Sequence, residues 1–521
     1  MAGPPDLPNR AGCVQTAFAM ALPTLVVTGS SGFLGRHLLD THKERYRIVG
    51  LARRSQARSG APVHPNIEWH QVDIGDREAL ERVFREIRER GGAQYLVHLA
   101  AHYDFTGVEH PEYWRTNVDG LRNVLDLSRN LGLRRFVFSS SVAACRMPGP
   151  GEVVDETTSA AGDHVYAKTK RMGEAMVQEY SDAFPSSIVR FAALFSDWCE
   201  YAPLFMFLST WLSTAWNARV LGGRGRSAIP YLHVLDAVSF VDTVIRKAAA
   251  LEPGSVLNAS PDGAVSHAEL FAAATAYQFG NARRPVFMPK FLCGPGMTAR
   301  MLAGKLTGEV PFERPWMARY IDTSLTVDAR RSRAILSWAP RERLEIVRRI
   351  PFLLENRRSD LEQWLRRNRA AMKQVEMRPN LKIHRLLEKH ESGIVESFTQ
   401  STMAPNAPPE LARYRGQSVE QQQWHHRLVL RQLMNAVRLR DRSGFMAYCR
   451  DLAEYRARQG FSADEVEHAF EELNRICILT LGFDDDSLDV RPYLDQEITT
   501  TLRFGCDQVQ ETYEMLEAVR G

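Results

Sequence analysis

The sequence predicts an α/β domain with a doubly wound parallel sheet and a small substrate lobe, followed by an all-α helical bundle domain. Three observations support this prediction. A chain of 521 residues is long for one hydrophobic core. Between residues 25 and about 250, short β-branched runs alternate with amphipathic stretches, as in successive βαβ units. After residue 377 the apolar residues recur only at helical spacing.

The strands are predicted in chain order from apolar runs bounded by turn residues. Five runs (LVVTG, YRIVGLA, IEWHQVD, YLVHLAA and RRFVFSSS) occupy residues 25–29, 46–52, 67–73, 95–101 and 134–141. Residues 187–195 form a sixth strand, and residues 256–259 are a further candidate. We assign the substrate lobe to about 196–235 and 255–345, where short helices and loops alternate. The charged helical stretch 341–372 closes the first domain.

The domain boundaries follow from changes in composition. Residues 1–22 are predicted to be a disordered leader, with Met20 as an alternative start. Residues 23–377 form the first domain, and residues 378–521 form a helical regulatory or dimerisation domain. The linker-like MRPN at 377–380 marks the boundary, where we expect few contacts to cross. Residues 462–465 (SADE) are a capping box that begins a helix.

The composition excludes several classes of protein. Apolar residues make up 44% and charged residues 25%, as in ordinary soluble proteins, and the net charge of +4 does not suggest a nucleic-acid partner. No uninterrupted apolar run reaches about 18 residues, so residues 201–216 are interpreted as a buried or pocket-lining helix. No membrane partner is predicted, and a membrane-surface contact of this helix is the less favoured alternative. The seven scattered cysteines lack metal-ligand spacing, which predicts no metal site and favours a cytoplasmic location.

The most specific local motif is TGSSGFLG, which follows the first strand and begins a helix. Its glycines, Gly29, Gly32 and Gly35, permit a tight turn and a close backbone approach to a pyrophosphate. The helix N-terminus offers amide donors to the same negative charge. The motif therefore predicts a Rossmann-like dinucleotide site.

A second motif, YxxxK, lies downstream at Tyr166 and Lys170, behind a strand that ends in three serines. Four residues along a helix place the two side chains on one face, where the lysine charge can lower the tyrosine pKa. A tyrosine tuned in this way can exchange a proton with a hydroxyl or carbonyl. We therefore expect an acid/base pair.

With these motifs, residues 22–350 resemble the extended short-chain dehydrogenase/reductase superfamily, in its epimerase/dehydratase-like branch. Further matching segments are Asp73–Ile74, HLAA, TNVDGLRNVL with Asn117, and YLHVLDA with His233 and Asp236. The resemblance implies hydride transfer with Tyr166 as acid/base, Lys170 on the ribose and Ser141 polarising the substrate oxygen, with Ser140 as the alternative serine. His233 and Asp236 are expected to pack the lobe.

The predicted cofactor contacts combine the glycine turn, the strand ends and the YxxxK pair. They are Gly29, Ser31, Gly32, Phe33, Leu34, Gly35, Arg53, Arg54, Asp73, Ile74, Leu99, Ala100, Ala101, Asn117, Tyr166 and Lys170. The second strand ends in Ala52, where NAD-selective relatives carry an acid, and Arg53 and Arg54 follow. Guanidinium groups can bind a 2′-phosphate, so NADP is favoured and NAD is the alternative.

Departures from the family pattern bear on the substrate. VRFAALFSDW keeps Arg190 but lacks the asparagine and the YGP of nucleotide-sugar enzymes. The lobe carries the apolar residues Phe205, Met206, Phe207, Trp211 and Trp216, which suit a hydrophobic small-molecule substrate. Arg224 and Arg226 leave an anionic handle on that substrate open.

Residues 380–515 resemble the sensory, globin-like domain of RsbR-type stressosome proteins, mainly through DLAEYRARQGFSADEVEHAFEELNRI. The resemblance implies a regulatory partner or a homodimer formed through this domain. For the whole chain we expect NADP(H)-dependent carbonyl reduction or alcohol oxidation. Two alternatives stay open: an epimerase or dehydratase acting on a nucleotide sugar, and a redox-sensing regulatory protein.

Overall fold

The computed structural model describes residues 22–105, 107, 109–307, 312–372, 379–405, 407–484, 487 and 490–520. Except for Leu22, the predicted leader lies outside these residues, and the predicted boundary at residue 378 falls in the undescribed stretch 373–378. Among the described helices, none combines the length and the apolar composition needed to cross a membrane.

The first domain is built on a seven-stranded parallel sheet in the order β11-β6-β5-β4-β1-β2-β3. Its strands are β1 (Thr24–Thr28), β2 (Arg47–Ala52), β3 (Ile67–Gln71), β4 (Tyr95–His98), β5 (Arg135–Ser141), β6 (Ser186–Phe191) and β11 (Ser255–Ala259). The strand candidate at 256–259, predicted within the lobe region, is the edge strand of this main sheet, paired with β6. The chain order reverses between β1 and β4, and α/β proteins bind ligands at the carboxyl end of such a switch point.

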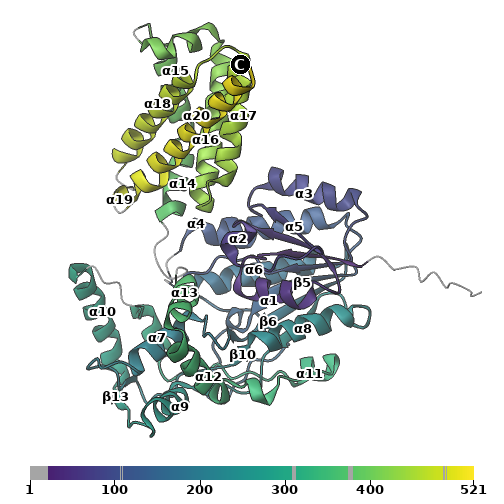
Figure 1. Cartoon of the computed structure of the whole chain (residues 1–521). Coiled ribbons are helices and arrows are strands. Elements are labelled where there is room, and N and C mark those ends of the chain that lie inside the picture. Colours follow the sequence, from purple (N-terminus) through teal and green to yellow (C-terminus); the bar gives the residue numbers. More distant parts are fainter. Residues whose placement is uncertain are drawn as a thin grey trace, which may run out of the picture.

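Helices cover both faces of the sheet (Figure 1). The apolar sides of α1 (Phe33–His42) and α8 (Val234–Arg246) share one core with the sheet. On the opposite face, α3 (Arg77–Glu89), α5 (Gly120–Ser128) and α6 (Val165–Glu179) form a second core. Burial on both faces explains the nearly continuous apolar runs of the strands.

The lobe has a separate core at the carboxyl edge of the sheet. Its helices are α7 (Ala202–Trp211), α9 (His267–Phe279), α10 (Lys290–Thr307), α12 (Ile346–Ser359) and α13 (Leu361–Met372), with the 3₁₀ helix Pro315–Tyr320. Short strand pairs join β7 (Ala193–Phe195) to β10 (Tyr231–His233), β8 (Val220–Gly222) to β13 (Val286–Met288), and β9 (Ala228–Ile229) to β12 (Val265–Ser266). The predicted sixth strand is therefore divided into β6 and β7. His233 and Asp236 hold the lobe through Asp197 and Arg341.

The C-terminal helices form a bundle with a core of their own, drawn from residues 383–509 (Figure 1). They are α14 (Pro379–Lys389), α15 (Glu391–Met403), α16 (Val419–Leu439), α17 (Ser443–Arg458), α18 (Ala463–Gly482), α19 (Arg491–Leu494) and α20 (Thr500–Arg520). The capping box at Ser462 and Glu465 is present at the start of α18, as predicted. The remaining helices are α2 (Gln56–Ser59), α4 (Pro111–Trp114), followed by the π-helical turn Arg115–Asp119, and α11 (Arg330–Leu336).

Candidate active site

The glycine turn has the geometry that a dinucleotide site needs. Gly29 has a φ of +72°, and a Cβ atom there would lie 2.7 Å from the Ala100 nitrogen. A Cβ on Gly35 would lie 2.5 Å from the Gly29 oxygen. No side chain caps the N-terminus of α1, so its first amides can bind a pyrophosphate. The turn therefore fits a dinucleotide cofactor.

Tyr166 and Lys170 lie on α6 beside the carboxyl end of β5. The Lys170 ammonium nitrogen lies 5.6 Å from the centre of the Tyr166 ring and donates a hydrogen bond of 2.5 Å to the Ser139 carbonyl. Tyr166 stacks on Tyr103, with the ring centres 4.3 Å apart. The YxxxK pair is thus held between the sheet and the loop that follows β4.

The electrostatics of this pair differ from the prediction in one respect. We expected Lys170 to lower the pKa of Tyr166, but burial raises the pKa of this tyrosine. Burial also lowers the pKa of Lys170 to about 8, against a smaller opposite effect of Glu174. Burial dominates because both charged forms lose their hydration in this position.

The structure distinguishes the two candidate serines. Ser140 is buried and donates a hydrogen bond of 2.5 Å to Glu174, which also forms a bidentate ion pair with Arg190. Ser141 is partly exposed in the cavity and its Oγ accepts a bond from the Ala143 amide. The Ser141 hydroxyl can therefore donate its proton to a substrate oxygen, whereas Ser140 supports the sheet through Glu174 and Arg190.

The predicted cofactor residues fall into two groups. Those that line one large cavity are Gly29, Ser31, Gly32, Phe33, Leu34, Gly35, Arg54, Leu99, Ala101 and Tyr166. Those outside its lining are Arg53, Asp73, Ile74, Ala100, Asn117 and Lys170. Both amide atoms of the Asn117 side chain bond the His102 backbone, and its nitrogen also donates to Thr169 on α6. Asn117 therefore positions the loop after β4 against the helix that carries Tyr166.

The side chains of the adjacent residues Arg53 and Arg54 make different contacts. Arg54 lines the cavity and donates a bond of 2.7 Å to the Ser31 carbonyl of the glycine turn. Burial lowers the Arg54 pKa, and the neighbouring cations Arg36, Arg53 and Arg58 lower it further. Arg53 instead lies 3.5 Å from Glu112, away from the cavity. An anion beside Arg54 would relieve the repulsion among these cations.

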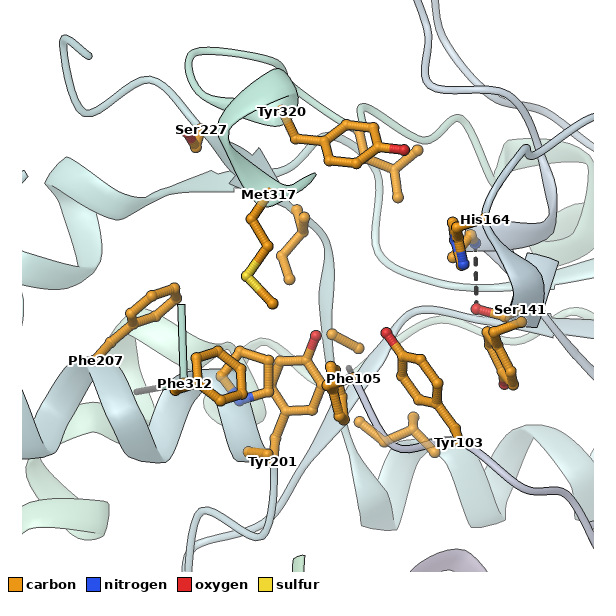
Figure 2. A pocket seen from close by; sticks show the side chains of 18 of the residues that line it. Tyr103, Phe105, Ser141, His164, Tyr201, Phe207, Ser227, Phe312, Met317 and Tyr320 are labelled. Carbon is orange, nitrogen blue, oxygen red and sulfur yellow. Dashed lines mark hydrogen bonds between the residues drawn. The ribbon is translucent and has the colours of Figure 1, made fainter. Parts of the chain in front are cut away.

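The cavity has a volume of about 1350 Å³ and runs from the glycine turn into the lobe. Figure 2 shows Tyr103, Phe105, Tyr201, Phe312 and Met317 around it, with Ser141 and His164 on one side of the view and Phe207 on the other. Sequence patterns did not single out Tyr103, Phe105, Phe312 or Met317, since these residues lie in loops and short turns without a motif. The cavity therefore joins the YxxxK site to a largely aromatic chamber.

Some of the predicted lobe residues line the cavity and others lie outside its lining. Phe207, Trp211 and Trp216 line the cavity, whereas Phe205 packs against Trp364 and Met206 belongs to a small apolar cluster. Arg224 and Arg226 do not line the cavity, and their backbone amides donate to the Asp322 carboxylate. The structure thus does not bring the predicted anionic handle into the site.

The helical domain contacts the first domain through buried charges. Arg438, at the end of α16, is ion-paired with Asp73 after β3 and donates a bond of 2.7 Å to Glu112 on α4. All three side chains are buried. The Gln71 amide also donates to Asp441, at 3.1 Å. The helical domain is thus tied by a few polar contacts to the strand end that was predicted to bind cofactor.

Among the described residues, one group of side chains, Glu68, His70 and Glu86, is close enough together to share a metal ion. Glu68 is ion-paired with Arg47 and Arg90 and accepts a bond from His70. These cations already neutralise the carboxylate, so we assign no metal role to the group. The six cysteines of the described chain are free thiols.

Comparison with known families supports the fold and the cofactor class. Residues 25–260 match the model of the NAD dependent epimerase/dehydratase family. The predicted resemblance to this branch is therefore confirmed for residues 25–260. The match ends before the helical domain, whose resemblance to RsbR-type sensory domains stays a prediction.

Several named relatives match parts of the chain. A putative dihydroflavonol 4-reductase of Synechocystis is 34% identical over 135 residues, which cover 25% of this chain and 36% of that protein. A UDP-glucose 4-epimerase of Streptococcus mutans is 29% identical over 163 residues, 30% and 47% of the two chains. A dTDP-D-glucose 4,6-dehydratase of Dictyostelium discoideum is 24% identical over 273 residues, 47% and 60%. Each match spans less than two thirds of the relative's own length.

Solved structures show the same fold. A UDP-glucose 4-epimerase of Thermotoga maritima, solved with UDP-glucose, superposes with a TM-score of 0.51 at 20% identity over 65% of this chain and 100% of that chain. The Bordetella bronchiseptica enzyme WbmG, solved with NAD, gives 0.51 at 17% identity over 66% and 96%. At these identities the likeness establishes the architecture of the first domain.

Proposed function

We propose that this chain catalyses nicotinamide-dependent redox chemistry at a hydroxyl-bearing or carbonyl carbon. The observation that carries the proposal is that one cavity is lined by the glycine turn, Ser141 and Tyr166. A nicotinamide dinucleotide held at this turn would accept or supply the hydride. The family match of residues 25–260 supports this class of chemistry.

The chain's own residues would handle the proton and the substrate oxygen. Ser141 donates a hydrogen bond to that oxygen, and Tyr166 takes the hydroxyl proton during oxidation or returns it during reduction. Lys170 lies below the Tyr166 ring, where its charge favours the phenolate as the proton leaves. The raised pKa keeps Tyr166 protonated before a ligand binds, ready for the reductive direction.

An epimerase or dehydratase cycle, in which the cofactor ends in the redox state in which it began, is supported by the family match and by most of the relatives described above. These findings favour it over the simple carbonyl reduction expected from the sequence. The epimerase and dehydratase relatives are named as enzymes of nucleotide sugars. A nucleotide sugar is therefore the first substrate class to test.

A net reductase for an apolar alcohol or ketone is the second candidate. The aromatic lining of the cavity favours it, because Phe105, Phe207, Phe312 and Met317 offer no polar partner to a sugar hydroxyl. The Synechocystis relative named as a reductase is consistent with this alternative. For either candidate we propose NADP as the cofactor, because Arg54, which lines the cavity, can bind a 2′-phosphate.

One experiment separates the candidates. The purified full chain is denatured, its bound nucleotide and any bound small molecule are identified by mass spectrometry, and that molecule is prepared with deuterium at the reacting carbon. An epimerase or dehydratase cycle returns the label to the product with no net change in the cofactor. A net dehydrogenase transfers the label to the cofactor in proportion to turnover.

The third alternative, a redox sensor, predicts a different result. A sensor would bind the dinucleotide and change its association with partners, but no substrate would turn over. If the nucleotide is retained and neither nucleotide sugars nor apolar alcohols and ketones react, the catalytic proposal fails.

A further inference from the structure

The far end of the lobe carries an unusual group of exposed apolar side chains. We define the lobe tip by the exposed residues of the loop before β8, of β13 and of α10. They are Trp216 (86% exposed), Val286 (53%), Phe287 (48%), Phe291 (77%), Leu292 (47%) and Leu302 (54%). In Figure 1, α10 and β13 lie along the outer side of the lobe, away from the main sheet. Single exposed apolar residues are ordinary, but a cluster of this kind marks an interaction surface.

Helix α10 presents apolar residues on two sides. Cys293 is buried and, with Met297, lines the cavity. Phe291 is two residues before Cys293 and points about 200° away around the helix, whereas Phe291 and Leu302 lie within about 20° of each other. The outer stripe therefore has no partner in the described chain, although its residues are as apolar as those that pack inward.

The segments that build the tip are basic and contain no acid. Residues 201–235 and 280–302 include no Asp or Glu, and their cations are Arg219, Arg224, Arg226, Arg283, Arg284, Lys290 and Arg300. A neighbouring segment supplies two acids to these residues. Glu313 forms an ion pair with Arg300, whereas Asp322 accepts hydrogen bonds from the backbone amides of Arg224 and Arg226. The tip thus combines exposed aromatic residues with an excess of positive charge.

The tip is also continuous with the cavity. Trp216 is the most exposed residue of the tip and also lines the cavity. Gly296 and Ala299 on α10 are likewise exposed and line the cavity. An apolar molecule at the tip would therefore lie beside the cavity at Trp216 and α10. Tryptophan is enriched at the membrane interface because its ring is apolar and its N–H is polar.

We propose that the lobe tip docks on the surface of an anionic lipid bilayer and opens the cavity toward it. The apolar stripe of α10 enters the interface, and the surrounding cations bind the lipid headgroups. A second copy of the chain fits less well, because pairing two such tips would bring the same uncompensated cations together. The sequence predicted no membrane partner because no segment is long enough to span, but a surface contact needs no span.

Docking can be measured without turnover, so its test does not depend on the proposed function. The full chain is mixed with phosphatidylcholine vesicles, with or without phosphatidylserine, and the bound fraction is measured by flotation. We expect binding to the anionic vesicles that weakens with salt. The pair Phe291→Ser and Leu302→Ser should reduce the partition coefficient by about tenfold or more. The pair Arg284→Gln and Lys290→Gln should reduce it by about fivefold per charge, and only on anionic vesicles.

A matched control removes exposed apolar residues elsewhere. Val63 (85% exposed) and Trp424 (62%) lie outside the lobe, so Val63→Ser with Trp424→Ser should bind like the unmodified chain. Unchanged thermal unfolding of each variant excludes misfolding. Three results would overturn the proposal: no binding to anionic vesicles, equal loss in the control pair, or a lipid-free dimer that Phe291→Ser and Leu302→Ser abolish. The last result would assign the tip to self-association.

Discussion

Arg438 of the helical domain forms a buried ion pair with Asp73, the residue two positions after β3 ends, although the two residues are 365 positions apart in the chain. Arg438 and, to a smaller extent, Arg53 and the Gly75 amide hold the pKa of Asp73 well below its usual range, despite the burial that opposes this effect. The same guanidinium lowers the pKa of Glu112 to about 2 against burial. The two domains thus share one charged network at the edge of the seven-stranded sheet.

Arg438→Ala should destabilise the protein, because it leaves two buried carboxylates without their main partner. Removal of one member of a buried ion network costs about 3–5 kcal/mol. Chemical unfolding of the full chain measures this change. Arg458→Ala removes an exposed pair with Glu454 and should change the free energy of unfolding by less than about 1 kcal/mol. Equal effects of the two substitutions would show that the interdomain ion pair contributes no more to the free energy of unfolding than an exposed pair does.

Gly29→Ala should abolish cofactor binding and destabilise the fold. The substitution forces a positive φ on an L residue, at about 1–2 kcal/mol, and also drives a methyl group against the Ala100 nitrogen. Gly60→Ala is the matched control, since its φ is +64° and a Cβ there meets no atom within 4 Å. Thermal unfolding and dinucleotide titration of both variants separate the backbone strain from the steric contact. Normal binding in Gly29→Ala would contradict the assigned site.

Arg54→Ala should reduce the preference for NADPH over NADH, whereas Arg53→Ala should leave the preference intact. Only Arg54 lines the cavity, and Arg53 faces Glu112. One charge-assisted contact at a partly exposed site is expected to change the affinity ratio by about tenfold. Fluorescence titration with both nucleotides tests this difference. A preference that survives in Arg54→Ala, or is absent in the unmodified chain, would remove the basis for NADP.

Tyr166→Phe should abolish turnover while dinucleotide binding persists, because only the transferable proton is lost. General acid/base catalysis of this kind is worth about 10²–10⁴-fold in rate. The control is Tyr103→Phe, which keeps the ring that stacks on Tyr166 and should have a small effect on the rate. Rate measurements with the substrate identified by mass spectrometry distinguish the two. If Tyr103→Phe is the more damaging change, the acid/base assignment belongs to Tyr103.

The pKa of Lys170 predicts opposite trends in activity and stability with pH. Burial lowers this pKa from 10.5 to about 8, so the charge that supports Tyr166 is lost as the pH rises through about 8, and kcat/KM should fall there. Between these two values the unfolded chain binds the proton that the folded chain has released, so the contribution of Lys170 to stability increases with pH. Lys170→Met should show neither trend, and a persisting fall in kcat/KM would assign the titration to another group.

Much of the first domain could be predicted from local patterns. The glycine turn after β1 and the YxxxK spacing on α6 are short-range features, because strand, turn and helix periodicities alone bring their side chains together. The same applies to the capping box at Ser462 and Glu465, which satisfies its own backbone amides. The strand at 256–259 was recognised but assigned to the lobe region, since its pairing with β6 depends on a long-range contact.

The sequence by itself therefore determined the fold class and the local geometry of the glycine turn and of the YxxxK pair, because each depends on residues close together in the chain. Only the tertiary structure decided which of two neighbours faces the cavity: Arg54 rather than Arg53, and Ser141 rather than Ser140. It also decided the partner of Asp73 and the exposure of Phe291. These features depend on side-chain direction and on contacts between distant segments, and no local pattern of residue types encodes either.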